Sequence, residues 1–156
     1  SFARRFRELV TVPPARLRRL AHDVGDSPLR PFRLGDPRHP AVRVRLHVPD
    51  AVRPAPRVQV WAGWFAQRAP FGLPRGGVLV DHADEVEIPL APGFPWLLAN
   101  VLPADADPGE QIAPAQPIVA VHPAPITAPC AVTLHFSPAH STLPLLTALP
   151  SWRRPS

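Results

Sequence analysis

Proline is the residue that most limits what this chain can fold into. It makes up 25 of the 156 residues, about three times its usual share of roughly 5%. A proline inside a helix removes a hydrogen bond and clashes with the preceding turn, so long helices are excluded from most of the chain. Proline also cannot donate to the ladder of a central strand. The sequence therefore favours short strands that are joined by proline-rich turns.

Apolar and polar residues alternate through the middle of the chain, which is the pattern of half-buried strands. In the segment 41–48, Val42, Val44 and Leu46 share one face while Arg43 and Arg45 share the other. Further strands are predicted at 57–65, 77–82, 84–90, 96–102, 117–123 and 131–137. Short strands at this spacing, with turns and no helix between them, are typical of an antiparallel β-sandwich or a partly open barrel.

The two ends of the chain differ from this middle part. Near residues 1–10 and 15–25, arginines accompany apolar residues at helical spacing, which predicts two short basic helices. A loop is expected at 26–40, and the proline-rich last segment is expected to dock as a tail. The sequence thus divides into a basic helical arm with its loop (1–40), an all-β sandwich domain (41–137) and a Pro-rich tail (138–156).

Charge is unevenly divided between the two halves of the chain. The first 80 residues hold 15 arginines and 5 acidic residues, a net charge of +10, whereas the remaining 76 hold 2 arginines and 7 acidic residues, a net charge of −5. Such asymmetry favours an acidic or polyanionic partner, or assembly through the two halves. Alternatively, the basic and acidic surfaces meet inside one fold.

The arm and the tail carry the residues that we expect to contact a partner. Aromatic and arginine side chains are enriched where protein interfaces hold most of their binding energy. Trp61 falls on the nominally outer face of its strand, where it is either a partner contact or part of the core. The expected contacts are Phe2, Phe6, Arg4, Arg5, Arg16, Arg18, Arg19, Trp61, Leu145, Leu146, Leu149 and Trp152.

These features favour a non-enzymatic interaction or assembly module that is a subunit of a larger complex. We expect a protein partner or a homo-oligomer, and a virion- or capsid-associated protein fits a basic arm ahead of a sandwich. A further alternative is a polyanion binder, in which the arginine-rich half contacts nucleic acid and binding weakens steeply with salt. Against it, no helix-turn-helix, zinc finger or RNA-recognition motif is found.

A small metal- or ligand-binding enzyme is the rival from another class. His82, His122 and His135 lie on or beside predicted strands and could together hold zinc or copper. The chain has no pair of cysteines, no Gly-x-Ser-x-Gly nucleophile motif and no glycine-rich phosphate loop. We therefore expect no catalytic residue and no cofactor, with the three histidines as the alternative.

A membrane is a less favoured partner, although basic amphipathic helices can also contact anionic membranes. No apolar run reaches the roughly 18–20 residues that span a bilayer. The first residues include Arg4, Arg5 and Arg7 and lack the apolar segment of a signal peptide. Cys130 is the single cysteine, which excludes an internal disulfide. These features favour a cytoplasmic or virion location.

Overall fold

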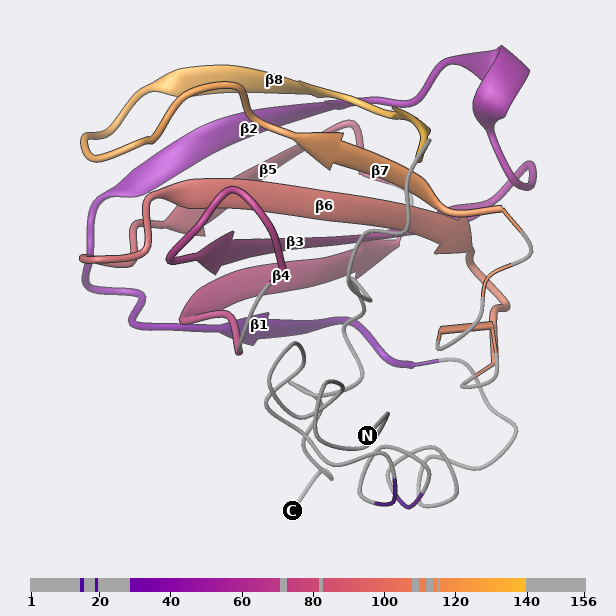
Figure 1. Cartoon of the computed structure of the whole chain (residues 1–156), viewed down its shortest axis with the longest axis horizontal. Helices are drawn as coiled ribbons and strands as arrows, with labels where there is room; N and C mark the ends of the chain where they lie inside the picture. The colour runs from indigo at the N-terminus through magenta and orange to yellow at the C-terminus, as the bar shows by residue number, and fades with distance from the viewer. Residues whose placement is uncertain are drawn as a thin grey trace, which may run out of the picture.

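The computed structural model describes residues 15, 19, 29–70, 73–81, 83–107, 110–111, 114 and 116–139. Within these ranges the regular structure is almost entirely β-strand, which confirms the expected all-β class. The elements, in chain order, are β1 (Phe32–Leu34), β2 (Ala41–His47), the 3-10 helix η1 (Asp50–Val52), β3 (Val58–Phe65), β4 (Gly76–Asp81), β5 (Glu85–Pro89), β6 (Trp96–Pro103), β7 (Ile118–Val121), β8 (Ala131–His135) and β9 (Ser137–Pro138) (Figure 1).

All the strands predicted from alternation are present, with ends that differ by no more than about two residues. Two short strands were not predicted: β1 lies in the segment expected to be a loop, and β9 includes Pro138 of the expected tail. Strands of two or three residues are too short to show a period. Of the expected basic helices, Ala15 and Arg19 are helical and exposed, and the other residues lie outside the described ranges. No helix in the described part of the chain has the length and apolar composition to cross a membrane.

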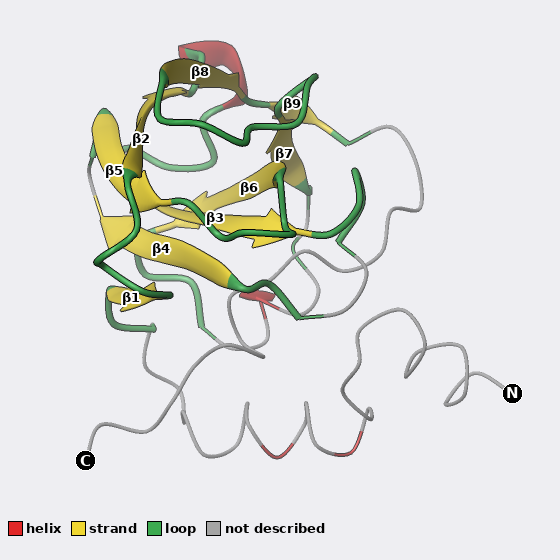
Figure 2. Ribbon diagram, turned by 90° about the vertical axis from the view of Figure 1, so that its left-hand side faces the viewer, coloured by secondary structure: helices red, strands yellow, loops and turns green. Residues whose placement is uncertain are grey.

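The strands form two sheets that face each other as layers (Figure 2). Sheet A has the order β1-β4-β3-β6-β7-β9, and sheet B has the order β5-β2-β8. Every pair is antiparallel except β2 and β8, which are parallel, with Arg43 opposite Ala131 and His47 opposite His135. The expected β-sandwich is confirmed, with this one parallel pair in an otherwise antiparallel arrangement among the described strands. Parallel neighbours need a long crossover, and here the chain passes through β3, β4, β6 and β7 of sheet A before it returns as β8.

The core lies between the two sheets. On β2, Val42 and Val44 are fully buried and Leu46 is nearly so, and each such burial contributes about 1.5–3 kcal/mol. From sheet A, the indole of Trp64 enters the same core, and its Nε1–H donates a hydrogen bond of 2.8 Å to the carbonyl oxygen of Pro89 on β5. This bond satisfies the buried indole N–H and joins the two sheets at the β5 side.

Both faces of β3 are buried, so sheet A is covered on its outer face as well. Trp61 on that face is 1% exposed, and its ring centre lies 5.7 Å from that of Phe32. Gly63 and Gly77 are opposite each other on β3 and β4. An added Cβ would lie 3.0 Å from Cζ2 of Trp61 at Gly63, and 2.8 Å from its Cη2 at Gly77. The two glycines therefore make room for the indole to lie over the sheet.

Gly77→Ala tests this close packing. The new methyl group would lie 2.4 Å from the carbonyl oxygen of Ala62, which is backbone and cannot swing away. We expect the free energy of unfolding to fall by about 3 kcal/mol, measured by urea denaturation. Gly93→Ala is the matched control, because a Cβ there meets nothing within 4 Å and only its left-handed backbone costs about 1 kcal/mol. Equal losses in the two variants would contradict the packing argument.

Candidate functional site

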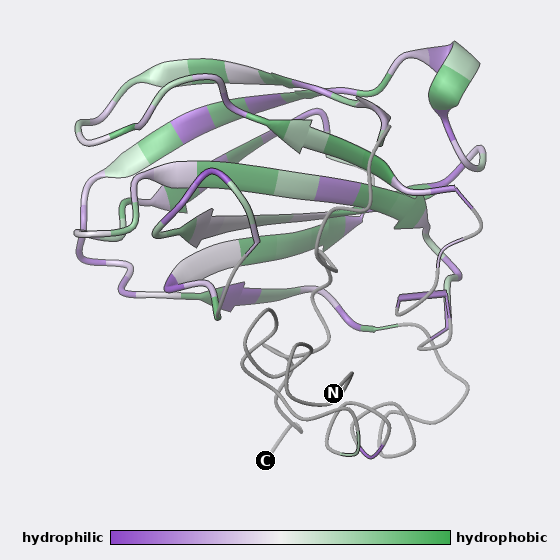
Figure 3. Ribbon diagram, in the orientation of Figure 1, coloured by the Kyte–Doolittle hydropathy of each residue, from purple (hydrophilic) through white to green (hydrophobic). Residues whose placement is uncertain are grey.

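Sheet B presents a polar outer face that is made by every second residue of its three strands. Its central strand β2 alternates between buried apolar and exposed polar side chains, visible as green and purple bands in Figure 3. The neighbours follow the same alternation in register. The outer face consists of Glu85 and Glu87 on β5, Arg43, Arg45 and His47 on β2, and Ala131, Thr133 and His135 on β8.

The acidic strand β5 lies against the arginines of β2. In the register of this pair, Arg43 is opposite Glu87 and Arg45 is opposite Glu85. The shortest contact is diagonal, with Nε of Arg43 at 3.4 Å from Oε1 of Glu85. Both side chains are about half exposed, so the ion pair contributes no more than about 1 kcal/mol. Here a basic strand from the first half of the chain and an acidic strand from the second half meet inside one sheet.

On the other side of β2, two histidines come together. His47 and His135 are in register at the ends of the parallel strands, with ring centres 5.6 Å apart and ring planes at 69°. Both residues are exposed. No hydrogen bond or ion pair of either imidazole is found among the described residues. The sequence did not predict this pair, because it depends on the parallel pairing of two strands that are far apart in the chain.

Of the three histidines that were predicted to form a metal site, the structure describes His122 and His135. His82 lies outside the described residues. His122 follows β7 and His135 ends β8, and the chain reverses direction between these two strands (Figure 1). The Nδ1 atom of His122 instead lies 2.7 Å from the carbonyl oxygen of Ala124. In the described part of the chain, no three His, Cys, Asp or Glu side chains are grouped so that they could hold a metal ion.

The two edges of sheet B differ in their backbone groups. On β5, the carbonyl oxygen of Glu87 accepts a hydrogen bond of 2.9 Å from Nη1 of Arg33. The next outward carbonyl, of Pro89, accepts the bond from Trp64 described above, and proline has no N–H to offer. Side chains and a proline thus occupy the edge of β5, a common way to keep another strand from pairing there.

The edge of β8 is open within residues 29–139 as far as the structure describes them. Arg43 donates its N–H to the carbonyl oxygen of Cys130 at 3.0 Å, and Phe136 donates to the carbonyl oxygen of His47 at 3.1 Å. In a parallel ladder, residues 130, 132, 134 and 136 then face β2, and the N–H and C=O groups of Ala131, Thr133 and His135 point away from it. None of these outward groups forms a hydrogen bond within the described part of the chain. The strand carries no Arg, Asp or Glu.

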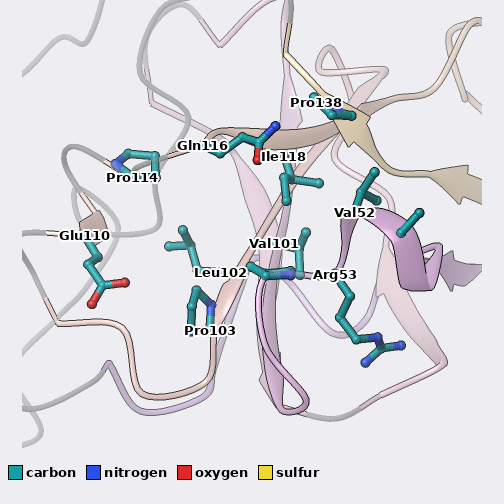
Figure 4. A pocket seen from close by; sticks show the side chains of 12 residues that line it. Val52, Arg53, Val101, Leu102, Pro103, Glu110, Pro114, Gln116, Ile118 and Pro138 are labelled. Atoms are coloured by element: carbon teal, nitrogen blue, oxygen red, sulfur yellow. The ribbon is translucent and has the colours of Figure 1, made fainter.

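An open groove of about 470 Å³ lies at one end of the molecule, beside η1 and the end of β6 (Figure 4). Its walls are largely apolar, with Arg53 and Glu110 on opposite sides in the view of Figure 4. Its size is within the range of small-molecule sites. The described residues that line it are Ala51, Val52, Arg53, Pro54, Val101, Leu102, Pro103, Glu110, Pro114, Gln116, Ile118 and Pro138. Arg53 and Glu110 are the ionisable groups among them, and they do not form a nucleophile–base pair.

A smaller pocket of about 180 Å³ is bordered by Asp36, His39 and Arg75. Arg38 donates side-chain and backbone hydrogen bonds to the carboxylate of Asp36, at 2.9–3.2 Å. These bonds hold the pKa of Asp36 below its usual value, with a smaller contribution from His39. The same pair raises the pKa of Arg38.

Most of the expected partner contacts lie outside the described residues. This holds for Phe2, Phe6, Arg4, Arg5, Arg16, Arg18, Leu145, Leu146, Leu149 and Trp152. Arg19 is exposed on its helical segment. Trp61 is in the interior, which favours its interpretation as a core residue over that of a surface anchor. Its buried Nε1 has no hydrogen-bond partner among the described residues.

No protein-family model, curated protein or solved structure matches this chain. The features of its own surface that call for an explanation lie on sheet B. They are the open edge of β8 and the histidine pair beside it.

Arg38→Gln tests the origin of the Asp36 pKa. A lowered carboxylate pKa means that the interaction stabilises the fold at neutral pH and is lost as the pH falls through that value, below about 3.9. The variant should raise the pKa of Asp36 toward the ordinary value, as measured by an NMR titration of its carboxyl carbon. His39→Gln should raise it less, because His39 is the weakest of the contributions. An unchanged pKa in Arg38→Gln would show that this pairing is not its cause.

Proposed function

We propose that this chain is a non-enzymatic assembly module that pairs with a second copy of itself through the open edge of β8. The observation that carries the proposal is the contrast between the two edges of sheet B. The edge of β5 is occupied by Arg33, Trp64 and Pro89, whereas β8 offers outward N–H and C=O groups. An edge of this kind is a ready template for another strand.

The side chains of β8 suit pairing with their own copy. In an antiparallel pair centred on Thr133, each Thr133 lies opposite its counterpart, and each Ala131 lies opposite a His135. Cross-strand threonine pairs are favourable, and no like charges are opposed. The outward backbone groups of these residues are the ones that would form the hydrogen-bonded pairs. The interface is then symmetric and closed, as in most homodimers.

This pairing would join two copies of sheet B into one continuous sheet. The strand order would be β5-β2-β8 followed by the same order reversed in the second copy. Both outer edges of the joined sheet would then be β5 strands, on which the outward carbonyls of Glu87 and Pro89 are already bonded by side chains. Assembly through β8 therefore ends at two copies and does not extend into a fibre.

Thr133→Pro is the experiment that tests the proposal. The Thr133 N–H points away from β2, so proline at this position removes an intermolecular donor without removing a ladder bond within the chain. We expect the unchanged chain to sediment as a dimer in analytical ultracentrifugation, and the variant to sediment as a monomer. Circular dichroism of the variant should retain the β-sheet spectrum of the parent.

Thr133→Val is the matched control, since it keeps the N–H and the β-branched shape and should remain dimeric. If the proline variant does not fold, Thr133→Lys replaces it, because an edge lysine opposes strand pairing by charge. A monomeric parent chain would refute the proposal. So would a folded Thr133→Pro or Thr133→Lys chain that still forms the dimer.

A further inference from the structure

Two imidazoles that lie side by side on an exposed sheet surface can chelate one metal ion. His47 and His135 occupy matching positions at the ends of β2 and β8, and both side chains lie on the outer face. The geometry points to this pair as a binding site for a divalent transition-metal ion, with Cu²⁺ as the ion it suits best. The site lies within one chain, so it goes beyond the proposed assembly and does not depend on it.

The separation of the rings matches shared coordination. A metal ion lies roughly 2 Å from an imidazole nitrogen and roughly 3 Å from the ring centre, so two rings on one ion have centres roughly 4.5–5.5 Å apart. The observed separation is 5.6 Å, just above this range, and the ring planes meet at 69° and are not stacked. The two rings therefore have to approach each other only slightly to bind one ion.

The ligand set selects the class of metal. Imidazole nitrogens suit copper, nickel and zinc, and among divalent ions of this series Cu²⁺ binds nitrogen ligands most tightly. Two adjacent nitrogens with water in the remaining positions fit the tetragonal geometry that Cu²⁺ prefers. Calcium and magnesium need oxygen ligands in larger number, which this pair does not supply.

The imidazoles of the pair are available to a ligand. Neither imidazole has a hydrogen bond or ion pair to give up within the described part of the chain. The nearest formal charge along β2 on the same face is Arg45, which lies opposite the carboxylate-bearing Glu85. Cys130 lies at the other end of β8 from His135 and is exposed, so the thiol is not a ligand of this site.

The test is a Cu²⁺ titration of the whole chain at about pH 7.5, because imidazole binds metal ions in its deprotonated form. We expect one ion per chain by isothermal titration calorimetry, and electron paramagnetic resonance that shows two equatorial imidazole nitrogens. His47→Gln and His135→Gln should each weaken binding by roughly tenfold or more, and the spectrum should then show a single imidazole. Cys130→Ser should leave the affinity unchanged.

A chain in which His22, His39, His82, His122 and His140 are all replaced by Gln is the matched control, and it should bind Cu²⁺ like the parent. If that chain does not fold, the five single variants are measured in its place. Loss of the ion from any of these controls would assign it to other histidines and overturn the proposal. Equal affinity in His47→Gln or in His135→Gln would overturn it as well, as would a parent chain that binds no Cu²⁺.

Discussion

The parallel pairing of β2 with β8 is the interaction on which the surface of this molecule depends. It places β2 at the centre of sheet B. Val42 and Val44 are buried in the core there, and the residues between and beside them face outward. Because the ladder is parallel, residues 130, 132, 134 and 136 use their backbone groups toward β2. The same register leaves the backbone N–H and C=O groups of Ala131, Thr133 and His135 pointing away from β2. It also places His47 beside His135.

The abundance of proline has a structural counterpart at the sheet edges. Pro89 is the last residue of β5, where a missing N–H costs nothing because that side of the strand has no neighbour. Its carbonyl oxygen accepts a hydrogen bond from the indole N–H of Trp64. Pro89 therefore blocks strand pairing at this edge and also links the two sheets. By contrast, β8 contains no proline between Ala131 and His135. Although the chain is rich in proline, every residue of the edge strand β8 therefore keeps a backbone N–H that can donate a hydrogen bond.

Alternation predicted strands such as β2 and β5 well, since each has one face in the core and the other exposed. It could not predict which strands pair, because Ala131 to His135 carries the same pattern whether it lies beside β2 or elsewhere. The histidine pair depends on that pairing. Sequence reasoning instead grouped His82, His122 and His135, because the strands near His122 and His135 could be neighbours, although the chain reverses between these two residues. For a similar reason, the sequence did not decide whether Trp61 is a core residue or a partner contact. Its burial depends on Gly63 and Gly77, and Gly77 belongs to a different strand.

The charge asymmetry of the sequence is resolved in part inside the fold. Arg43 and Arg45 belong to the basic half, and they lie in register with Glu87 and Glu85 of the acidic half. Because these arginines lie next to glutamates within one sheet, their positive charges do not by themselves imply a polyanionic partner. What remains on the outer face is β8, which contains no Arg, Asp or Glu between Ala131 and His135. A neutral strand is what self-pairing requires, since two copies of a charged edge would repel each other.

Assembly through β8 and metal binding by the histidine pair are physically separable. Strand pairing uses backbone groups in the plane of the sheet, whereas the imidazoles stand out from its face. In a pair centred on Thr133, the two His135 residues lie at opposite ends of the joined strands, each next to the His47 of its own chain and opposite an Ala131 of the other. A bound ion would therefore be held by one chain alone and would not bridge the two. The sheet edge and the sheet face can then serve different ligands at the same time, because neither uses the groups that the other needs.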